Sequence, residues 1–253
     1  MDGKGCRGWR GGWWIVATLL GACGGDDRAS NVAAPGQAES LKTRMLESGA
    51  ALLQDKPPIE ALNAYLDGFH FYNGRADQQM EAHHYCSQVN DEVRQCVIFD
   101  GNGGDAKLMG VEYILSARLF QSLPAEEKTF WHSHVHEVKS GQLLAPGIPA
   151  VAEHALMAQL VGTYGKTWHT WHTDQQLALP QGIPQLMMGF TADGQLHPRM
   201  LAGRDRRLGI DSREKAGQRA DIVAPAIDPQ ADAWQRESAL QLQDPRGAEA
   251  PAH

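Results

Sequence analysis

A hairpin predicted around Asn90 and Asp91 constrains the fold more than any other feature of the sequence. The segments "EAHHYCSQV" and "RQCVIFD" on either side have the composition of strands, and Asn and Asp favour the turn between them. A turn centred on Asp91 places Cys86 opposite Cys96. It also sends neighbouring side chains to opposite faces, because the side-chain period of a strand is two residues.

Further helix and strand patterns surround this hairpin. Apolar spacing predicts helices over 41–53 and 58–69, the second with Pro58 in its first turn. Other helices are expected at "PAEEKTFWH", "AVAEHALMAQLVGTYG" and "PRMLAGRDRRLGI", and strands at "KLMGVEYILS", "SHVHEVK", "KTWHTWHT" and "PQLMMGFT". The order of these segments predicts a single α+β domain, with a mostly antiparallel sheet and flanking helices.

The first residues have the features of a bacterial lipoprotein signal. Three basic residues precede the apolar run "WWIVATLL", which is far shorter than the roughly 20 residues of a membrane-spanning helix. The following "LGAC" resembles a lipobox, so residues 1–22 are predicted to be a signal peptide and Cys23 the lipidated residue. Acyl chains such as palmitate on Cys23 would anchor the protein to a membrane. Gly24 in place of aspartate favours an outer membrane, if the host has one.

Composition divides the rest of the chain into a tether, a domain and a tail. Residues 23–40 carry the lipid and a small, polar segment expected to be a flexible tether. One domain is expected over 41–228, followed by a flexible tail over 229–253 that is rich in Ala, Gln and Pro. The net charge of -7 offers no basic surface for phosphates, so nucleic acid is excluded as an expected partner.

Three histidines alternate in the segment "FWHSHVHEVKSG". In a strand, His132, His134 and His136 would share one face. A His-X-His pair on a strand is a recurrent way to hold zinc or another divalent metal, since neutral imidazole binds such ions. Three interpretations remain open: a bound metal, histidines held by hydrogen bonds within the fold, and exposed histidines.

The predicted hairpin offers a third metal ligand, which a catalytic zinc site would need. His83 and His84 are neighbours in a strand, so one of them must point inward. Glu137 is a candidate to orient a ligand from outside the coordination sphere. His70, at the end of a predicted helix, is a second candidate for that outer role.

Cys86 and Cys96 are the two cysteines expected in the folded domain. Facing residues of an antiparallel pair lie about 4.5 to 5.5 Å apart, within the range of a disulfide, and an exported protein meets oxidising conditions. The alternatives are two buried thiols, or one thiolate at the metal.

Common catalytic motifs are absent from the sequence. There is no G-x-S-x-G elbow, no Walker loop and no dinucleotide fingerprint, and "DGNGGD" is expected to be a turn. The tryptophans are expected in the core. An apolar pocket beside the histidines would nevertheless suit a hydrophobic or lipid ligand.

Several long motifs together are similar to those of the oil body-associated proteins. They are "EAHHYCSQVNDEVRQCVIFD", "LMGVEYILS", "EEKTFWHSHVHEVKSG", "TYGKTWHTWHTD" and "GIPQLMMGF", in the same order over 49–225. This family of plants, fungi and bacteria has no established biochemical activity. The resemblance implies one domain and, as in plant members, association with lipid. Matching positions carry over His70, His83, His84, Cys86, Cys96, His132, His134, Glu137 and Lys139.

The chain departs from the plant pattern at three histidines. Plant members have tyrosine in place of His136, and cysteine and glutamine in place of His169 and His172. Plant members also keep the two matching cysteines in a reducing compartment, so a disulfide is not a requirement of the family. The metal hypothesis therefore rests on four candidate ligands: His83, His84, His132 and His134.

Two functional hypotheses follow from the sequence. The first is a lipid-anchored extracytoplasmic protein of the bacterial cell envelope, with a binding or structural role at a membrane or lipid surface. The second is a metal-dependent enzyme, a hydrolase or an oxidoreductase, that uses His132, His134 and a hairpin histidine as ligands. The sequence assigns no catalytic residue.

Overall fold

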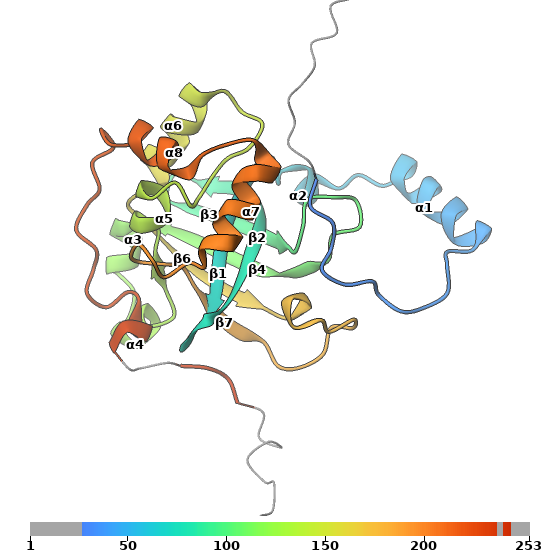
Figure 1. The fold of residues 1–253 in the computed structure, drawn as a ribbon. Coiled ribbons are helices and arrows are strands. Elements are labelled where there is room, and N and C mark those ends of the chain that lie inside the picture. The colour runs from blue at the N-terminus through green and yellow to red at the C-terminus, as the bar shows by residue number, and fades with distance from the viewer. Residues whose placement is uncertain (1–26, 237–239, 244–253) are drawn as a thin grey trace, which may run out of the picture.

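The computed structural model describes residues 27–236 and 240–243, which are built around a closed antiparallel barrel (Figure 1). Its strands follow the order β4-β3-β2-β1-β7-β6, and pairing of β6 with β4 closes the ring. A short strand, β5, pairs with β6. The strands are β1 (Ala64–Tyr72), β2 (Arg75–Asn90), β3 (Val93–Phe99), β4 (Leu108–Ser116), β5 (His132–Ser133), β6 (Thr163–His169) and β7 (Gln185–Met188).

Short helices connect the strands and cover parts of the barrel (Figure 1). They are α1 (Leu41–Leu53), α2 (Pro57–Glu60), α3 (Ala117–Gln121), α4 (Ala125–Lys128), α5 (Val135–Lys139), α6 (Ala150–Leu160), α7 (Pro198–Leu208) and α8 (Ser212–Gln218), with 3-10 turns η1 (Thr173–Gln175) and η2 (Ala233–Arg236). Within the described residues, none of these helices has the length and apolar character needed to cross a membrane.

The closed barrel corrects the predicted fold class. The expectation of an α+β domain with flanking helices is wrong, because the sheet closes on itself and the helices are few and short. Residues 64–72, expected within or near a helix, form β1 and are buried from Leu66 onward. Because both faces of the strand are covered, its sequence lacks the alternation of polar and apolar residues that marks a half-exposed strand. "SHVHEVK", expected to be a strand, instead enters helix α5 after Ser133.

The predicted hairpin is confirmed in position and register. β2 and β3 pair with Cys86 opposite Cys96 and His84 opposite Ile98. The helix over 41–53 and the strand at "KLMGVEYILS" also form as expected. Local patterns therefore identified these elements, whereas barrel closure depends on the long-range pairing of β4 with β6.

Alternate residues of the barrel strands point inward and form three layers. One apolar layer contains Leu66 and Ile114 together with the two cysteines of the hairpin. The other contains Tyr72, Met80 and Met187. Between them, the interior is filled by histidines and carboxylates, which are described below as the candidate site.

Parts of the predicted tether and tail pack against the barrel. Arg28 forms an ion pair with Glu81 of β2, and Val32 is buried. In the tail, Trp234 packs edge to face on an aromatic ring of β1. The predicted signal peptide, residues 1–22, and the predicted lipidation site Cys23 lie outside the described residues.

Two buried arginines fasten the C-terminal helices to the barrel. Arg204 of α7 donates to Asp67 of β1 at 3.1 Å and also to main-chain oxygens of the 141–142 segment. Arg219, directly after α8, donates to Glu153 of α6 at 2.8 Å. These ion pairs satisfy carboxylates that the fold removes from water.

Replacing Arg204 with alanine is expected to lower the free energy of unfolding by about 3–5 kcal/mol, because Asp67 would lose its closest cationic partner while staying buried. Arg199, an exposed residue of the same helix, provides the matched control, and Arg199→Ala should change stability by less than about 0.5 kcal/mol. Urea unfolding of both variants measures the difference. Equal stability of the two would show that the fold does not need the Asp67–Arg204 pair.

Candidate metal centre

Glu112 lies in the polar layer of the barrel and is surrounded by three histidines. Its Oε2 is 3.0 Å from Nε2 of His84, and its Oε1 is 3.2 Å from Nε2 of His134. Nε2 of His132 lies 3.4 Å from the same Oε1. All four side chains are buried, so three imidazoles share one carboxylate away from solvent.

The barrel brings these residues together from separate elements. His84 is on β2 and Glu112 on β4, which are separated in the sheet by β3, so their contact crosses the interior. His132 lies on β5, and His134 immediately precedes α5. Because α5 begins directly after His134, Glu137 in its first turn points back toward the histidines. Its Oε2 is 4.0 Å from Nε2 of His132.

The centre contains two carboxylates and no balancing arginine or lysine. Within the described residues, the ion-pair partners of Glu112 and Glu137 are all histidines. Burial alone would raise the pKa of Glu112, but contacts with the surrounding histidines outweigh it and hold that pKa well below its ordinary value. Burial, with the nearby charge of Glu112, raises the pKa of Glu137 well above its ordinary value. Glu112 is therefore ionised at neutral pH, and Glu137 holds a proton more tightly than Glu112 does.

Burial also lowers the pKa of three imidazoles in this layer, those of His70, His132 and His169. The pKa of His132 falls below its ordinary value, and that of His70 falls well below it. Burial lowers the pKa of His169 to about 3. These rings are neutral at pH 7, and neutral imidazole is the form that binds a metal ion.

Several polar atoms of the centre have no hydrogen-bond partner among the described residues. They are both ring nitrogens of His132, Nδ1 of His84 and Oε2 of Glu137. A buried polar atom without a partner costs about 1–3 kcal/mol, so native folds rarely leave several together. A metal cation would satisfy imidazole nitrogens and a carboxylate at the same time.

Gly165 of β6 leaves space where three of these side chains converge. A Cβ at this position would overlap Oε1 of Glu112 and lie 2.8 Å from Nε2 of both His132 and His134. Gly189 has a similar role on another side, since a Cβ there would lie 2.7 Å from Oε2 of Glu137. The absence of both side chains makes room for the cluster.

The cavity within this layer is the size of a single ion or water molecule. Its volume is about 10 Å³, close to the minimum that holds one water. The polar residues that line it are His70, His84, Glu112, His134 and Glu137. In this conformation the cavity has no space for an organic substrate.

His70 and His169 extend the cluster along the barrel. Nδ1 of His70 is 3.4 Å from Nε2 of His169. Potential ligand atoms of His70, Glu112 and His132 lie within 4.8 Å of one another, and so do those of His132, His134 and Glu137. His132 belongs to both sets, which makes it the middle of the cluster.

The structure separates the four predicted ligands. His84, His132 and His134 meet at Glu112, whereas His83 lies on the outer face of β2, where its Nδ1 is 2.8 Å from the hydroxyl of Tyr65. The alternation of the 132–136 segment does not continue, because α5 directs His136 away from the cluster. Among the other predicted residues, His70 and Glu137 both line the central cavity.

A second group of potential ligands, formed by Asp67, Glu81 and His83, lies outside the barrel. Arginines already balance its carboxylates. Arg207 pairs with both Asp67 and Glu81, and Arg28 pairs with Glu81. This group is therefore an ion-pair network and not a candidate metal site.

The remaining predicted residues have structural contacts. Cys86 and Cys96 are joined by a disulfide, so neither sulfur is a free thiolate. Lys139 donates to the main-chain oxygens of Arg219, Ala220 and Ile222, and thereby holds the end of α8.

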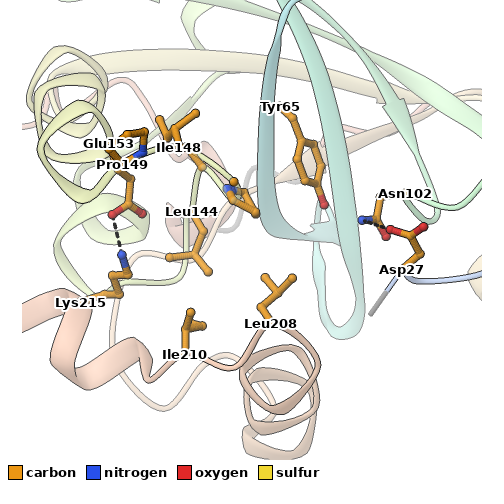
Figure 2. Close-up of a pocket in the computed structure, with 13 residues that line it drawn as sticks. Asp27, Tyr65, Asn102, Leu144, Ile148, Pro149, Glu153, Leu208, Ile210 and Lys215 are labelled. Carbon is orange, nitrogen blue, oxygen red and sulfur yellow. Dashed lines mark hydrogen bonds and ion pairs between the residues drawn. The ribbon is translucent and has the colours of Figure 1, made fainter. Parts of the chain in front are cut away.

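A larger cavity lies outside the barrel between β1 and the C-terminal helices (Figure 2). Its volume is about 630 Å³. Tyr65 and the Lys215–Glu153 ion pair line it, together with apolar side chains such as Leu144 and Leu208. Because it shares no lining residue with the cavity around Glu112, the two spaces are distinct.

Sequence reasoning missed Glu112, the residue that organises the centre. The signal was present, since Glu112 is the charged residue within the strand "LMGVEYILS". Its register opposite Cys96, which itself faces Cys86, places it on the inner face of the barrel. Pairing the strand "LMGVEYILS" with the predicted hairpin would have placed Glu112 on the same face as the two cysteines. No sequence pattern indicates that side chains of the centre meet beside Gly165.

These observations define a closed antiparallel barrel protein with a buried histidine–carboxylate centre. A family model described as "Protein of unknown function (DUF1264)" matches residues 56–223. Oil body-associated protein 1B of Arabidopsis thaliana is 40% identical over 198 residues, which cover 78% of this chain and 82% of that protein. Oil body-associated protein 1A of Zea mays is 41% identical over 205 residues, covering 80% and 86% respectively.

The chain belongs to the DUF1264 family and is a homologue of the oil body-associated proteins. The resemblance of its motifs to that family is thereby confirmed. No solved structure shows a significant match.

Replacing Gly165 with alanine is expected to destabilise the fold by about 1–3 kcal/mol, because the added methyl group overlaps the buried cluster. Gly217→Ala on α8 is the control, since a Cβ there meets nothing within 4 Å. Thermal unfolding of both variants in metal-free buffer makes the comparison. If Gly165→Ala were as stable as Gly217→Ala, the close packing of the centre around Gly165 would be refuted.

Proposed function

We propose that the barrel binds one divalent metal ion, such as zinc, at Glu112. His84, His132 and His134 would supply imidazole nitrogens, and Glu112 would supply a carboxylate oxygen. Such a mixed nitrogen and oxygen set suits zinc. The observation that carries the proposal is the ionised, buried Glu112, whose ion-pair partners among the described residues are imidazoles rather than arginine or lysine.

The distances from Glu112 to the histidines are close to the ligand separation of a tetrahedral ion. Two ligands that each lie about 2.0–2.1 Å from a tetrahedral zinc are about 3.3 Å apart. The three contacts of Glu112 span 3.0 to 3.4 Å, with His84 at Oε2 and His132 and His134 at Oε1.

The small cavity favours a stabilising ion over a catalytic one. A catalytic metal needs an open coordination position that substrate can reach, whereas the cavity here is only about 10 Å³. A bound ion would neutralise Glu112 and tie β2, β4 and β5 together across the interior. This favours the binding or structural hypothesis over the hydrolase or oxidoreductase alternative.

Metal content distinguishes the two neighbouring hairpin histidines. We expect chain purified without a histidine tag to hold about one metal ion, and His84→Gln to weaken zinc affinity at least about tenfold, because a ligand is lost. His83→Gln is the matched control, since His83 lies on the opposite face of the same strand, and it should keep the metal. Elemental analysis and competition with a chelator measure both. Equal affinity in the two variants would contradict the assigned ligands.

The sequence and the relatives support a second part of the function, attachment to a lipid surface. The relatives are named oil body-associated proteins, and the lipobox-like sequence ends at Cys23. Acylation of Cys23 would place the barrel at the bacterial cell envelope, and at the outer membrane if the host has one. More than one acyl chain gives stable anchoring, at about 0.8 kcal/mol per buried methylene.

Cys23→Ser is expected to abolish incorporation of radiolabelled palmitate and to leave the precursor uncleaved, because the modified sulfur is removed. Cys6→Ser provides the control, since Cys6 lies within the predicted signal peptide and should not affect the mature chain. Labelling and electrophoresis in a bacterial host measure both effects. Undiminished labelling of the Cys23→Ser chain would exclude this residue as the anchor.

A further inference from the structure

Helix α1 is amphipathic, yet none of its residues is buried. At 100° per residue, its large apolar side chains fall within about 140° of the helix surface. They are highly exposed: Leu41 63%, Met45 64%, Leu46 65%, Leu52 85% and Leu53 82%. Figure 1 shows α1 extending from the barrel on the side of α2, away from α6 and α8. A helix with this pattern suits a membrane interface.

An apolar groove opens on the outer face of the barrel beside α2. It has a volume of about 440 Å³. Its apolar lining residues include Ile59 of α2, Leu62, Tyr85, Val97, Phe99 and Leu108. Ile59 is 63% exposed and Leu108 48% exposed, so the groove presents apolar surface to solvent. We call α1 and this groove together the apolar face.

The N-terminal segment is fixed to the barrel at the rim of this groove. The main-chain oxygen of Arg28 accepts hydrogen bonds from the nitrogens of Asn102 and Gly103, each at 3.1 Å. Gly103 also lines the groove. The side chain of Arg28 pairs with Glu81, and the hydroxyl of Ser30 donates to Asp100 at 2.8 Å.

This attachment leaves only a short connection to the proposed anchor. Cys23 precedes Asp27 by four residues, and four residues span at most about 14 Å. The attachment at 28–30 therefore replaces the long tether expected over 23–40. An acylated Cys23 cannot lie far from the rim of the groove, so the barrel cannot turn freely at the membrane.

We propose that the apolar face rests on the phospholipid bilayer, with α1 in the headgroup region and acyl chains against the groove. The proposal rests on acylation of Cys23. The short connection brings the bilayer to this face and selects lipid over a second copy of the chain as its occupant. The exposed leucines of α1 then add apolar contact to that of the lipid anchor.

Site-specific fluorophores test which face meets lipid. In the acylated chain, Cys23 is blocked and Cys86 and Cys96 form a disulfide, so one introduced cysteine can be labelled with an environment-sensitive dye. Leu52→Cys and Ile59→Cys probe the apolar face. Val151→Cys on α6 is the control, because Val151 is 84% exposed and α6 lies on the other side of the barrel. Each labelled chain is reconstituted on phosphatidylcholine vesicles with and without doxyl-labelled lipid.

We expect doxyl lipid to quench the dye at positions 52 and 59 and to leave position 151 unchanged. Equal quenching at all three positions, or none at 52 and 59, would overturn the proposal. A blue shift at 52 and 59 that grows with protein concentration without vesicles would assign the face to a second copy and would also overturn it. Mass spectrometry of the N-terminal peptide separates the two proposals. A chain without acyl groups refutes the anchor and this inference together, whereas an acylated chain with no quenching refutes the face alone.

Discussion

The structure depends most on how the carboxylate of Glu112 is accommodated inside a barrel. An ionised carboxylate in an apolar interior is costly unless it is paired. Here β2, β5 and the residue before α5 supply the imidazoles of His84, His132 and His134, and among the described residues no arginine or lysine pairs with Glu112. The apolar layers on both sides separate the centre from water. A divalent cation at Glu112 would resolve this imbalance of charge.

On the outer face of the barrel, in contrast, arginines balance the buried carboxylates. His83, next to His84 in sequence, points toward Asp67 and Glu81, whose charges are balanced by Arg28 and Arg207. One hairpin therefore carries an ion-pair network on its outside and a group of candidate metal ligands on its inside. The outer network also secures the N-terminal segment through Arg28, so it links the fold to the proposed orientation at the membrane.

Sequence patterns predicted local elements well and the global fold poorly. The hairpin register followed from the turn at Asn90 and Asp91. It predicted that either His83 or His84 faces the interior, and the structure shows that the residue is His84. Apolar spacing misassigned β1, because a strand covered on both faces lacks alternation. Strand alternation also failed beyond His134, where α5 begins. Closure of the barrel and the space beside Gly165 depend on contacts between distant segments, which a single sequence does not display.

The proposed centre and the proposed anchor are independent of each other, since the metal would lie inside the barrel and the lipid contact outside it. X-ray absorption spectroscopy at the zinc edge of the zinc-loaded chain tests the metal centre most directly. We expect about four nitrogen and oxygen neighbours at about 2.0–2.1 Å, with the outer-shell scattering of imidazole rings. A sulfur shell near 2.3 Å, or a coordination sphere without imidazole scattering, would contradict it.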